Sequence, residues 1–393
     1  MKKIISILVL SLVIGLFALG NSYAEEGWIS PTFGLKETYE DNIYLTRYNE
    51  KSDLITTVSP GVLINPDLGE HKLSIDIHSD LNFFNDYHSQ DTNNYISLTN
   101  LDLNFNNFSI NFDNKYSYFT DRSGAEDVNR VKRLQDHSSL GTTFDFNKLD
   151  LTVRYLYRYE YYRTDDAIGD YLSQALSYKD LNRQENTVEI ESAFKLWPKT
   201  ALLLSADYGG IDHNTGKKSD SKYYDLFVGA RGEPTAKCIV EGKVGYRDQG
   251  FNDDAKDFDN LVFYGSIVEN FSAKDALRFD FLRTTNDTIF TDNPYYEISF
   301  GGLGYEHKFN ERFLGGLKFS YQLDAYPVAV RNTENNIVEK REDDVWKTGA
   351  RLQYDMPVGA ILELKYEHTV RDSNFSAYDY KNNLVSVGAK IVF

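Results

Sequence analysis

The feature that most constrains this chain is a strict alternation of short and long connections along its length. Between the connections lie segments in which apolar and polar residues alternate one by one. A soluble sandwich with Greek-key links has no reason to alternate its connections, whereas a transmembrane barrel has turns on one side and loops on the other. The short connections are turns at 65–70, 105–107, 146–149, 197–200, 232–236, 270–275, 308–312 and 355–359. The long connections are polar stretches at 41–53, 85–93, 120–136, 163–185, 211–221, 248–259, 284–294, 324–342 and 372–381.

The alternating segments are typical of strands with one apolar and one polar face. In residues 72–83, for example, Leu73 and Ile75 point to one side, while Lys72 and Asp76 point to the other. The connections separate about eighteen such strands, with sixteen as the alternative count. We therefore predict an all-β fold, a transmembrane antiparallel outer-membrane β-barrel with long extracellular loops and short periplasmic turns.

The composition favours strands and argues against several functions. The chain has 29 Tyr and 25 Phe, and 15% of its residues are aromatic. Its mean hydropathy of -0.48 excludes a helical membrane protein. Cys238 is the only cysteine, so we expect no internal disulfide, no metal site and no cofactor. The net charge of -17 argues against nucleic acid as a partner.

Residues 1–24 have the parts of a secretory signal peptide. A charged start and an apolar stretch precede a small-residue cleavage site at Ser22-Tyr23-Ala24. An uncleaved membrane anchor is the alternative interpretation. We expect residues 25–393 to form a single barrel domain of an exported protein in the bacterial outer membrane. Strand patterns begin soon after the cleavage site, so we expect no plug domain before the barrel.

The last residues form an alternating strand that ends on an aromatic residue. This strand must close the barrel against the first strand, expected near residues 29–39, because a free edge is unstable in lipid. Its spacing resembles the terminal signal of outer-membrane barrels that the barrel assembly machinery reads. We expect this machinery as a partner, with outer-membrane lipid and lipopolysaccharide around the finished barrel. The residues of the signal are Val385, Val387, Ala389, Ile391 and Phe393.

Aromatic residues on the apolar face are candidates for the interfacial girdles of a barrel. Examples are Tyr155, Tyr161, Phe313 and Trp346. A platform for stacking sugars is the alternative interpretation of the many tyrosines. We favour girdles, because most of the aromatic residues share the apolar face.

A barrel of this strand number is roughly 35 Å across, which is too wide for side chains to fill. The lumen is therefore a wet channel or is plugged by loops. The longest loops, 163–184 and 324–343, are the candidates for folding inward. In the first of them, Ile168, Leu172 and Leu176 share one stripe of a short predicted helix.

Charged residues of both signs fall on the polar face of the strands. A lattice of salt bridges that keeps a wide barrel round is one interpretation. A wall of donors and acceptors, along which a hydroxylated polymer slides without sticking, is the other. The lumen-lining candidates are Lys72, Asp76, Asp80, Arg154, Arg158, Glu160, Lys243, Arg247, Glu363, Lys365, Glu367 and Arg371.

The 7 histidines give no clear catalytic site. Asp76, His78 and Asp80 share one strand face, but no nucleophile is indicated beside them. A serine from a neighbouring strand is the remaining alternative. We do not expect an enzyme.

The first hairpin resembles the opening of a known family. Tyr39 to Ile43 form a Tyr-acid-Asp-Asn-aliphatic run, and Lys51-Ser52-Asp53 lead into the segment LITTVSPGVLI. These residues resemble the Putative beta-barrel porin 2 family of outer-membrane proteins, often encoded with exopolysaccharide synthesis and secretion genes. The resemblance implies a porin that acts as a passive conduit for an exopolysaccharide, above a periplasmic polysaccharide export protein. A general diffusion porin for small solutes is the alternative, followed by an outer-membrane enzyme or a closed structural barrel.

Overall fold

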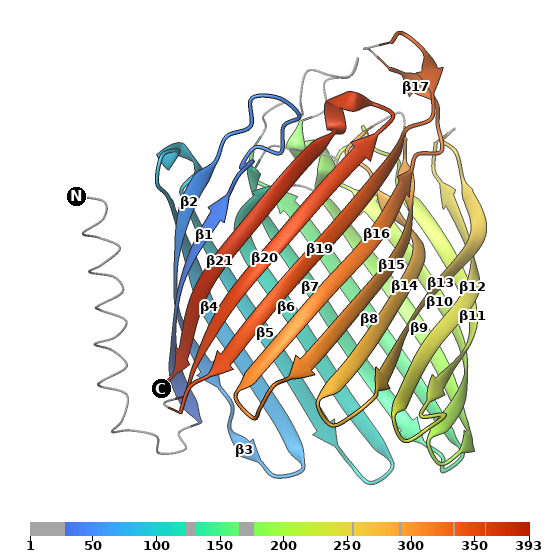
Figure 1. Cartoon of the computed structure of the whole chain (residues 1–393). Helices are drawn as coiled ribbons and strands as arrows, with labels where there is room; N and C mark the ends of the chain where they lie inside the picture. The colour runs from blue at the N-terminus through green and yellow to red at the C-terminus, as the bar shows by residue number, and fades with distance from the viewer. Residues whose placement is uncertain are drawn as a thin grey trace.

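The computed structural model describes residues 28–122, 130–164, 177–253, 255–290, 293–332, 335–357 and 359–393. In this part of the chain, tilted antiparallel strands form one closed barrel (Figure 1). The sheet has 19 strands, and the two-residue β3 (Asp67–Leu68) only extends a turn, so eighteen long strands make the described wall. The long strands are β1 (Ile29–Glu40), β2 (Asp53–Ile64), β4 (His71–Phe84), β5 (Thr92–Asn104), β6 (Phe108–Arg122), β7 (Arg130–Asp145), β8 (Leu149–Tyr162), β9 (Arg183–Trp197), β10 (Thr200–His213), β11 (Ser221–Gly232), β12 (Cys238–Phe251), β13 (Phe258–Asn270), β14 (Asp275–Asp287), β15 (Tyr295–Lys308), β16 (Phe313–Ala325), β19 (Glu342–Asp355), β20 (Ala360–Ser373) and β21 (Tyr380–Val392).

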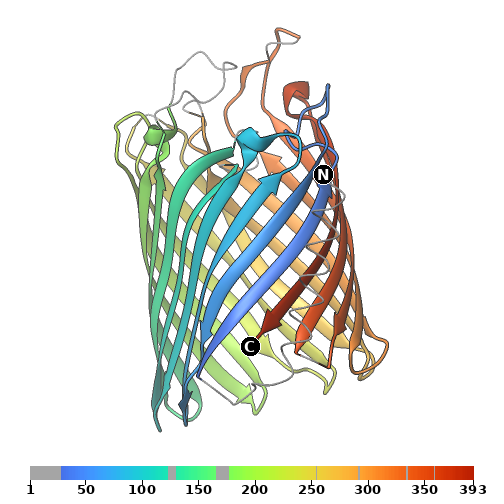
Figure 2. The same cartoon turned by 90° about the vertical axis from the view of Figure 1, so that its left-hand side faces the viewer.

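The barrel closes where the first and last strands meet. β1 pairs with β2 on one side and with β21 on the other, where Phe33 lies opposite Ile391. The backbone N–H of Phe393 donates to the carbonyl oxygen of Pro31 at 2.9 Å. Figure 2 shows the two strands side by side, blue beside dark red. The pairing removes the free edges of the first and last strands, as lipid requires, and the predicted barrel architecture is confirmed.

The connections have the two predicted lengths, short at one end of the barrel and longer at the other (Figure 1). The long loops carry three short 3-10 helices in the described residues, η2 (His88–Gln90), η3 (Tyr178–Leu181) and η4 (Ser376–Tyr378), and a small hairpin of β17 (Val330–Arg331) and β18 (Val338–Glu339). The predicted loop at 120–136 was too long, because β6 continues to Arg122 and β7 begins at Arg130. These strand ends hold only two apolar residues, Val131 and Leu134, among charged and polar ones, so the alternation is too weak there to mark a strand.

Two predictions concern residues outside the described part of the chain. One is the signal peptide of residues 1–24, and the other is the helical stripe of Ile168, Leu172 and Leu176. In the described residues, no helix is both long and apolar enough to span a membrane.

The outer face of the wall is apolar and aromatic. Leu226 and Leu317 expose 67% and 59% of their surface on this face. Phenylalanines gather at the turn end, where the rings of Phe105 and Phe108 stack with centroids 4.5 Å apart. Such a band is what lipid contact requires of a barrel. The four predicted girdle residues lie on this outer face, namely Tyr155, Tyr161, Phe313 and Trp346.

Candidate functional site in the lumen

The predicted lumen-lining residues lie on the face of the wall opposite to the exposed apolar residues. On β8, Val153 and Tyr155 are exposed on the outside. Arg154 lies between them in sequence, points inward and pairs with Glu189 of β9 at 2.8 Å. The same alternation places the other candidates on the inner face. Their role in transport stays a prediction.

Most of these inner residues take part in ion pairs, many of which join neighbouring strands. The pairs connect groups of opposite charge that are only partly exposed, so they stiffen the wall and leave little uncompensated charge in it. Further pairs of the predicted residues are Arg158–Glu185 (3.3 Å), Glu160–Arg133 (2.9 Å), Lys243–Glu191, Arg247–Asp225 (2.7 Å), Lys365–Glu367 (3.0 Å) and Arg371–Asp343. In the described part of the chain, neither Lys72 nor Glu363 forms an ion pair or a hydrogen bond with another side chain.

The acidic and histidine residues on β4 do not form a catalytic triad. Nδ1 of His78 lies 2.7 Å from Asp76, whereas the hydroxyl group of Ser59 donates to Asp80 at 2.5 Å. The serine and the histidine therefore bind different carboxylates, and the hydroxyl is not activated by the imidazole. Among the described residues, no group of three or more His, Cys, Asp or Glu side chains could hold a metal ion.

The upper part of β14 leaves the wall and folds into the lumen. β13 and β14 pair only as far as Phe263 and Arg283, although β14 continues to Asp287. Beyond this point β14 stays paired with β15, up to Asp287 opposite Tyr295. The two strand ends thus form a hairpin that is free of β13 and bends inward. We call residues 284–290 and 293–296 the inner hairpin.

Aromatic packing holds the inner hairpin against the inner wall. Tyr295 packs against Phe251 and Phe258, with ring centroids 5.7 and 5.5 Å apart. Phe227 and Val262 belong to the same buried cluster. These side chains point into the barrel, where polar residues are expected, and the hairpin shields them from water.

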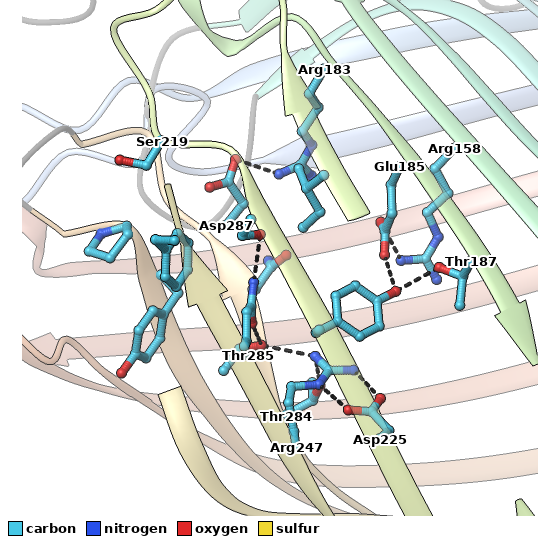
Figure 3. A pocket seen from close by; sticks show the side chains of 18 of the residues that line it. Arg158, Arg183, Glu185, Thr187, Ser219, Asp225, Arg247, Thr284, Thr285 and Asp287 are labelled. Carbon is cyan, nitrogen blue, oxygen red and sulfur yellow. Dashed lines mark hydrogen bonds and ion pairs between the residues drawn. The ribbon is translucent and has the colours of Figure 1, made fainter. Parts of the chain in front are cut away.

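Polar contacts add a second attachment lower on the hairpin. Arg247 donates to Asp225 at 2.7 Å and to Thr285 of the hairpin at 2.9 Å (Figure 3). The hydroxyl group of Thr285 in turn donates to Gln249 at 3.0 Å. A cavity of about 450 Å³ remains between the hairpin and the strands β8 to β12. Because this cavity is lined by paired charges and hydroxyl groups, it suits water and polar solutes.

Asp287 is the centre of a buried ion cluster at the top of the hairpin. It accepts hydrogen bonds from Arg183 at 2.6 Å and from Lys218 at 3.0 Å, and His213 lies 3.1 Å away. Arg183 belongs to β9 and Asp287 to β14, so the contact, drawn in Figure 3, spans the arc of wall formed by β10 to β13. Only 2% of the Lys218 side chain is exposed. The cluster therefore links the hairpin to the opposite side of this arc.

The hairpin tip carries two apolar residues, Ile289 and Phe290, which contact loops at the extracellular mouth. Ile289 is buried against Tyr162 and Tyr178, at the top of β8 and in the loop that follows. Phe290 lies near Tyr326 and Tyr378, with ring centroids 6.3 and 6.2 Å away. The tip thus contacts loops on both sides of the barrel and narrows the mouth.

Arg341 stacks between aromatic rings beside the tip. Its guanidinium lies 3.3 Å from the ring centroid of Tyr378 and 5.6 Å from that of Phe290. Burial alone would lower the pKa of Arg341, but Tyr326 and Asp343 hold that pKa above its ordinary value. The guanidinium is therefore a permanent cation in the mouth, where it contributes cation–π contacts.

Both loops that we expected to fold inward contribute residues to this mouth, through Tyr178 of the first and Tyr326 and Arg341 of the second. The inner hairpin itself was not predicted. Its sequence signal is the apolar pair Ile289-Phe290 within a polar loop, because two apolar residues exposed at a loop tip are unfavourable unless they are buried.

Comparisons with known proteins agree with this geometry. A family profile for Putative beta-barrel porin 2 matches residues 28–393. The solved structure of OccK2 (OpdF) from Pseudomonas aeruginosa is 10% identical with a TM-score of 0.50, and the match covers 93% of this chain and 98% of that chain. OccAB3 from Acinetobacter baumannii is 11% identical with a TM-score of 0.47, over 93% of this chain and 99% of that chain. No curated protein matches the sequence significantly.

The likeness to OccK2 shows the fold alone, which is that of an outer-membrane porin. The porin family and fold indicate a channel rather than an enzyme. Because the family profile spans the barrel from its first strand to its last residue, the chain belongs to the Putative beta-barrel porin 2 family of outer-membrane porins.

Proposed function

We propose that this porin is a passive conduit for an exopolysaccharide across the outer membrane. The observation that carries the proposal is the inner wall, which presents ion pairs such as Arg154–Glu189 together with hydroxyl groups such as that of Thr187. Such a surface offers many weak hydrogen bonds and few strong binding sites, so a chain with many hydroxyl groups can move along it. The family resemblance supplies the polymer as cargo.

Movement of the polymer needs an energy source and a guide on the periplasmic side. A passive barrel supplies neither, so we propose a periplasmic polysaccharide export protein as the partner at the short-turn end. The inner hairpin would then restrict the mouth until the polymer enters, because its aromatic and ionic contacts hold it in a position that narrows the extracellular side.

The second candidate function is a general diffusion porin for small solutes. The inner hairpin favours this alternative, because an inward-folded segment that narrows the lumen sets an upper size for solutes. The polar cavity of about 450 Å³ beside the hairpin fits small polar molecules.

The first test is to measure secreted and surface polysaccharide in a strain that lacks the gene. Complementation with the wild-type gene and with Asp344→Asn serves as the control, because Asp344 accepts a hydrogen bond from Tyr321 on the outer face. Loss of surface polymer, with polymer trapped in the periplasm, supports export. Unchanged surface polymer refutes it and leaves the diffusion porin, which single-channel conductance with small solutes then measures.

A further inference from the structure

A second hollow lies on the inner wall between β13 and β20, from the periplasmic end to the middle of the barrel. Its volume is about 510 Å³. Its floor is bare backbone, because Gly304, Gly316 and Gly349 replace inward-pointing side chains on β15, β16 and β19. A Cβ atom at Gly304 or Gly316 would meet no heavy atom closer than 4.0 or 3.7 Å. The hollow is thus created by the missing side chains and lies in the wall away from the inner hairpin.

The hollow is basic although the whole chain is acidic. Three of its cations have carboxylate partners close by, at 2.7 Å for Arg278–Asp280, 2.8 Å for Arg351–Glu306 and 3.0 Å for Lys365–Glu367. In the described residues, Lys318 and Lys347 have no carboxylate partner, and both are exposed to the lumen. The surplus positive charge of the hollow is therefore carried by these two lysines, within a chain of net charge -17.

The two lysines lie close together on adjacent strands. Gly349 is opposite Lys318 in the pairing of β16 with β19, and Lys347 is opposite Ser320. The two lysines are therefore diagonal neighbours, each two positions along its strand from the residue opposite the other, so their ammonium groups can reach one ligand from the same side of the floor. Unpaired ammonium groups kept next to each other raise the local concentration of anions.

We propose that this hollow binds an acidic sugar unit, one that carries a carboxylate, on its way through the barrel. This inference rests on the proposed polysaccharide conduit and names the chemistry of its cargo. The carboxylate would contact Lys318 and Lys347, and the sugar ring would lie over the glycine floor. The ring hydroxyls would donate to Glu306 and Glu367, which keep free acceptor sites beside their own cation partners. Because all these groups are solvated, the binding is weak and reversible, as passage requires.

The test is calorimetric titration of the purified full-length protein in detergent with trigalacturonate. Maltotriose, a neutral saccharide of equal length, is the reference probe. We expect trigalacturonate to bind at least tenfold more tightly than maltotriose, and its affinity to fall with added salt. Lys318→Gln and Lys347→Gln should each weaken its binding by about fivefold, as expected for solvated ion pairs. Lys222→Gln, which changes an exposed lysine of β11 outside the hollow, should leave the affinity unchanged.

Gly316→Leu provides an independent test, because its side chain would fill the hollow without removing charge. It should abolish binding of trigalacturonate, and the lysine variants decide the question if this variant does not fold. Equal affinity for trigalacturonate and maltotriose, or unchanged affinity in the two lysine variants, would overturn the proposal. If monomeric galacturonate binds as tightly as trigalacturonate, the ligand of the hollow is a small acidic solute, and the proposal of a polymer as its ligand is overturned.

The outcome is separable from the test of export. If the deletion strain loses its surface polymer but the protein does not bind trigalacturonate, the proposed binding site is refuted and the proposed export function is still supported. Specific binding that depends on the two lysines, with unchanged surface polymer, keeps the hollow as an acidic-saccharide site and refutes export as its purpose.

Discussion

Substitution of Asp287 by Asn should release the inner hairpin. Asp287 accepts from Arg183 at 2.6 Å and from Lys218 at 3.0 Å, and His213 lies at 3.1 Å. Asn has nearly the same shape, so the substitution removes the negative charge and leaves the packing in place. Both cations then remain in a site where only 25% of the Arg183 side chain and 2% of the Lys218 side chain are exposed.

The size of the effect follows from these contacts. Removal of one partner of a buried ion pair costs about 3–5 kcal/mol, because it leaves an uncompensated charge. The lower end applies here, since Lys218 also donates to the carbonyl oxygen of Thr288 and Arg183 lies 3.4 Å from Glu160. About 3 kcal/mol corresponds to roughly a hundredfold change in the ratio of hairpin-out to hairpin-in states.

Single-channel recordings in planar bilayers measure this ratio directly. We expect Asp287→Asn to spend up to about a hundredfold more time in the larger conductance state than the wild-type protein. Asp344→Asn, on the outer face, should behave as wild type. If Asp287→Asn shows wild-type conductance and wild-type dwell times, the ion cluster does not hold the hairpin, and the reasoning fails.

Three further predictions concern assembly and stability of the barrel. Deletion of Phe393 removes the terminal aromatic residue and its hydrogen bond to Pro31. We therefore expect less protein in the outer membrane and degradation in the periplasm, as measured by fractionation. An unchanged outer-membrane fraction would contradict this prediction. Gly61→Val should prevent folding, because even a Cβ atom would lie 2.8 Å from a carbonyl oxygen of β4, and a normal yield of heat-modifiable protein on gels would argue otherwise. Arg247→Ala should lower the free energy of unfolding by about 3 kcal/mol, because Asp225 is only 2% exposed and loses its bidentate partner. The gel shift measured against temperature gives the unfolding transition of each variant. A transition temperature equal to that of the wild-type protein would refute this prediction.

The barrel itself was predictable from sequence because each of its constraints is local. Lipid on one face and water on the other impose a period of two, and the turn and loop lengths set the order of strands. The alternation around Arg154 and around Lys365 therefore gave the correct inner face without any knowledge of neighbours. Closure of β1 on β21 followed from the need to pair both edges.

The inner hairpin was not predictable, because its position depends on contacts between residues far apart in the sequence. The polar stretch 284–294 was predicted as a connection, and β14 leaves β13 where that stretch begins, but nothing local shows that it stays paired with β15 and turns into the lumen. The partners Arg183 and Lys218 were single charges in polar stretches, like many others. Only the apolar pair Ile289-Phe290 is unusual for a loop, and it indicates burial without naming the partner.

The basic hollow was hidden for a different reason. Gly304, Gly316 and Gly349 lie on three different strands and mark no turn, so their shared position emerges only when the register of β15, β16 and β19 is known. The same register separates two regions of the lumen. Near the extracellular mouth, the charge of Asp287 on the hairpin is neutralised by Arg183 and Lys218 in a buried cluster. Near the middle of the wall, Lys318 and Lys347 remain free to meet a ligand that enters from the cell side. A conduit loaded from the periplasm needs its attractive surface before its restriction, and the basic hollow and the inner hairpin lie in that order.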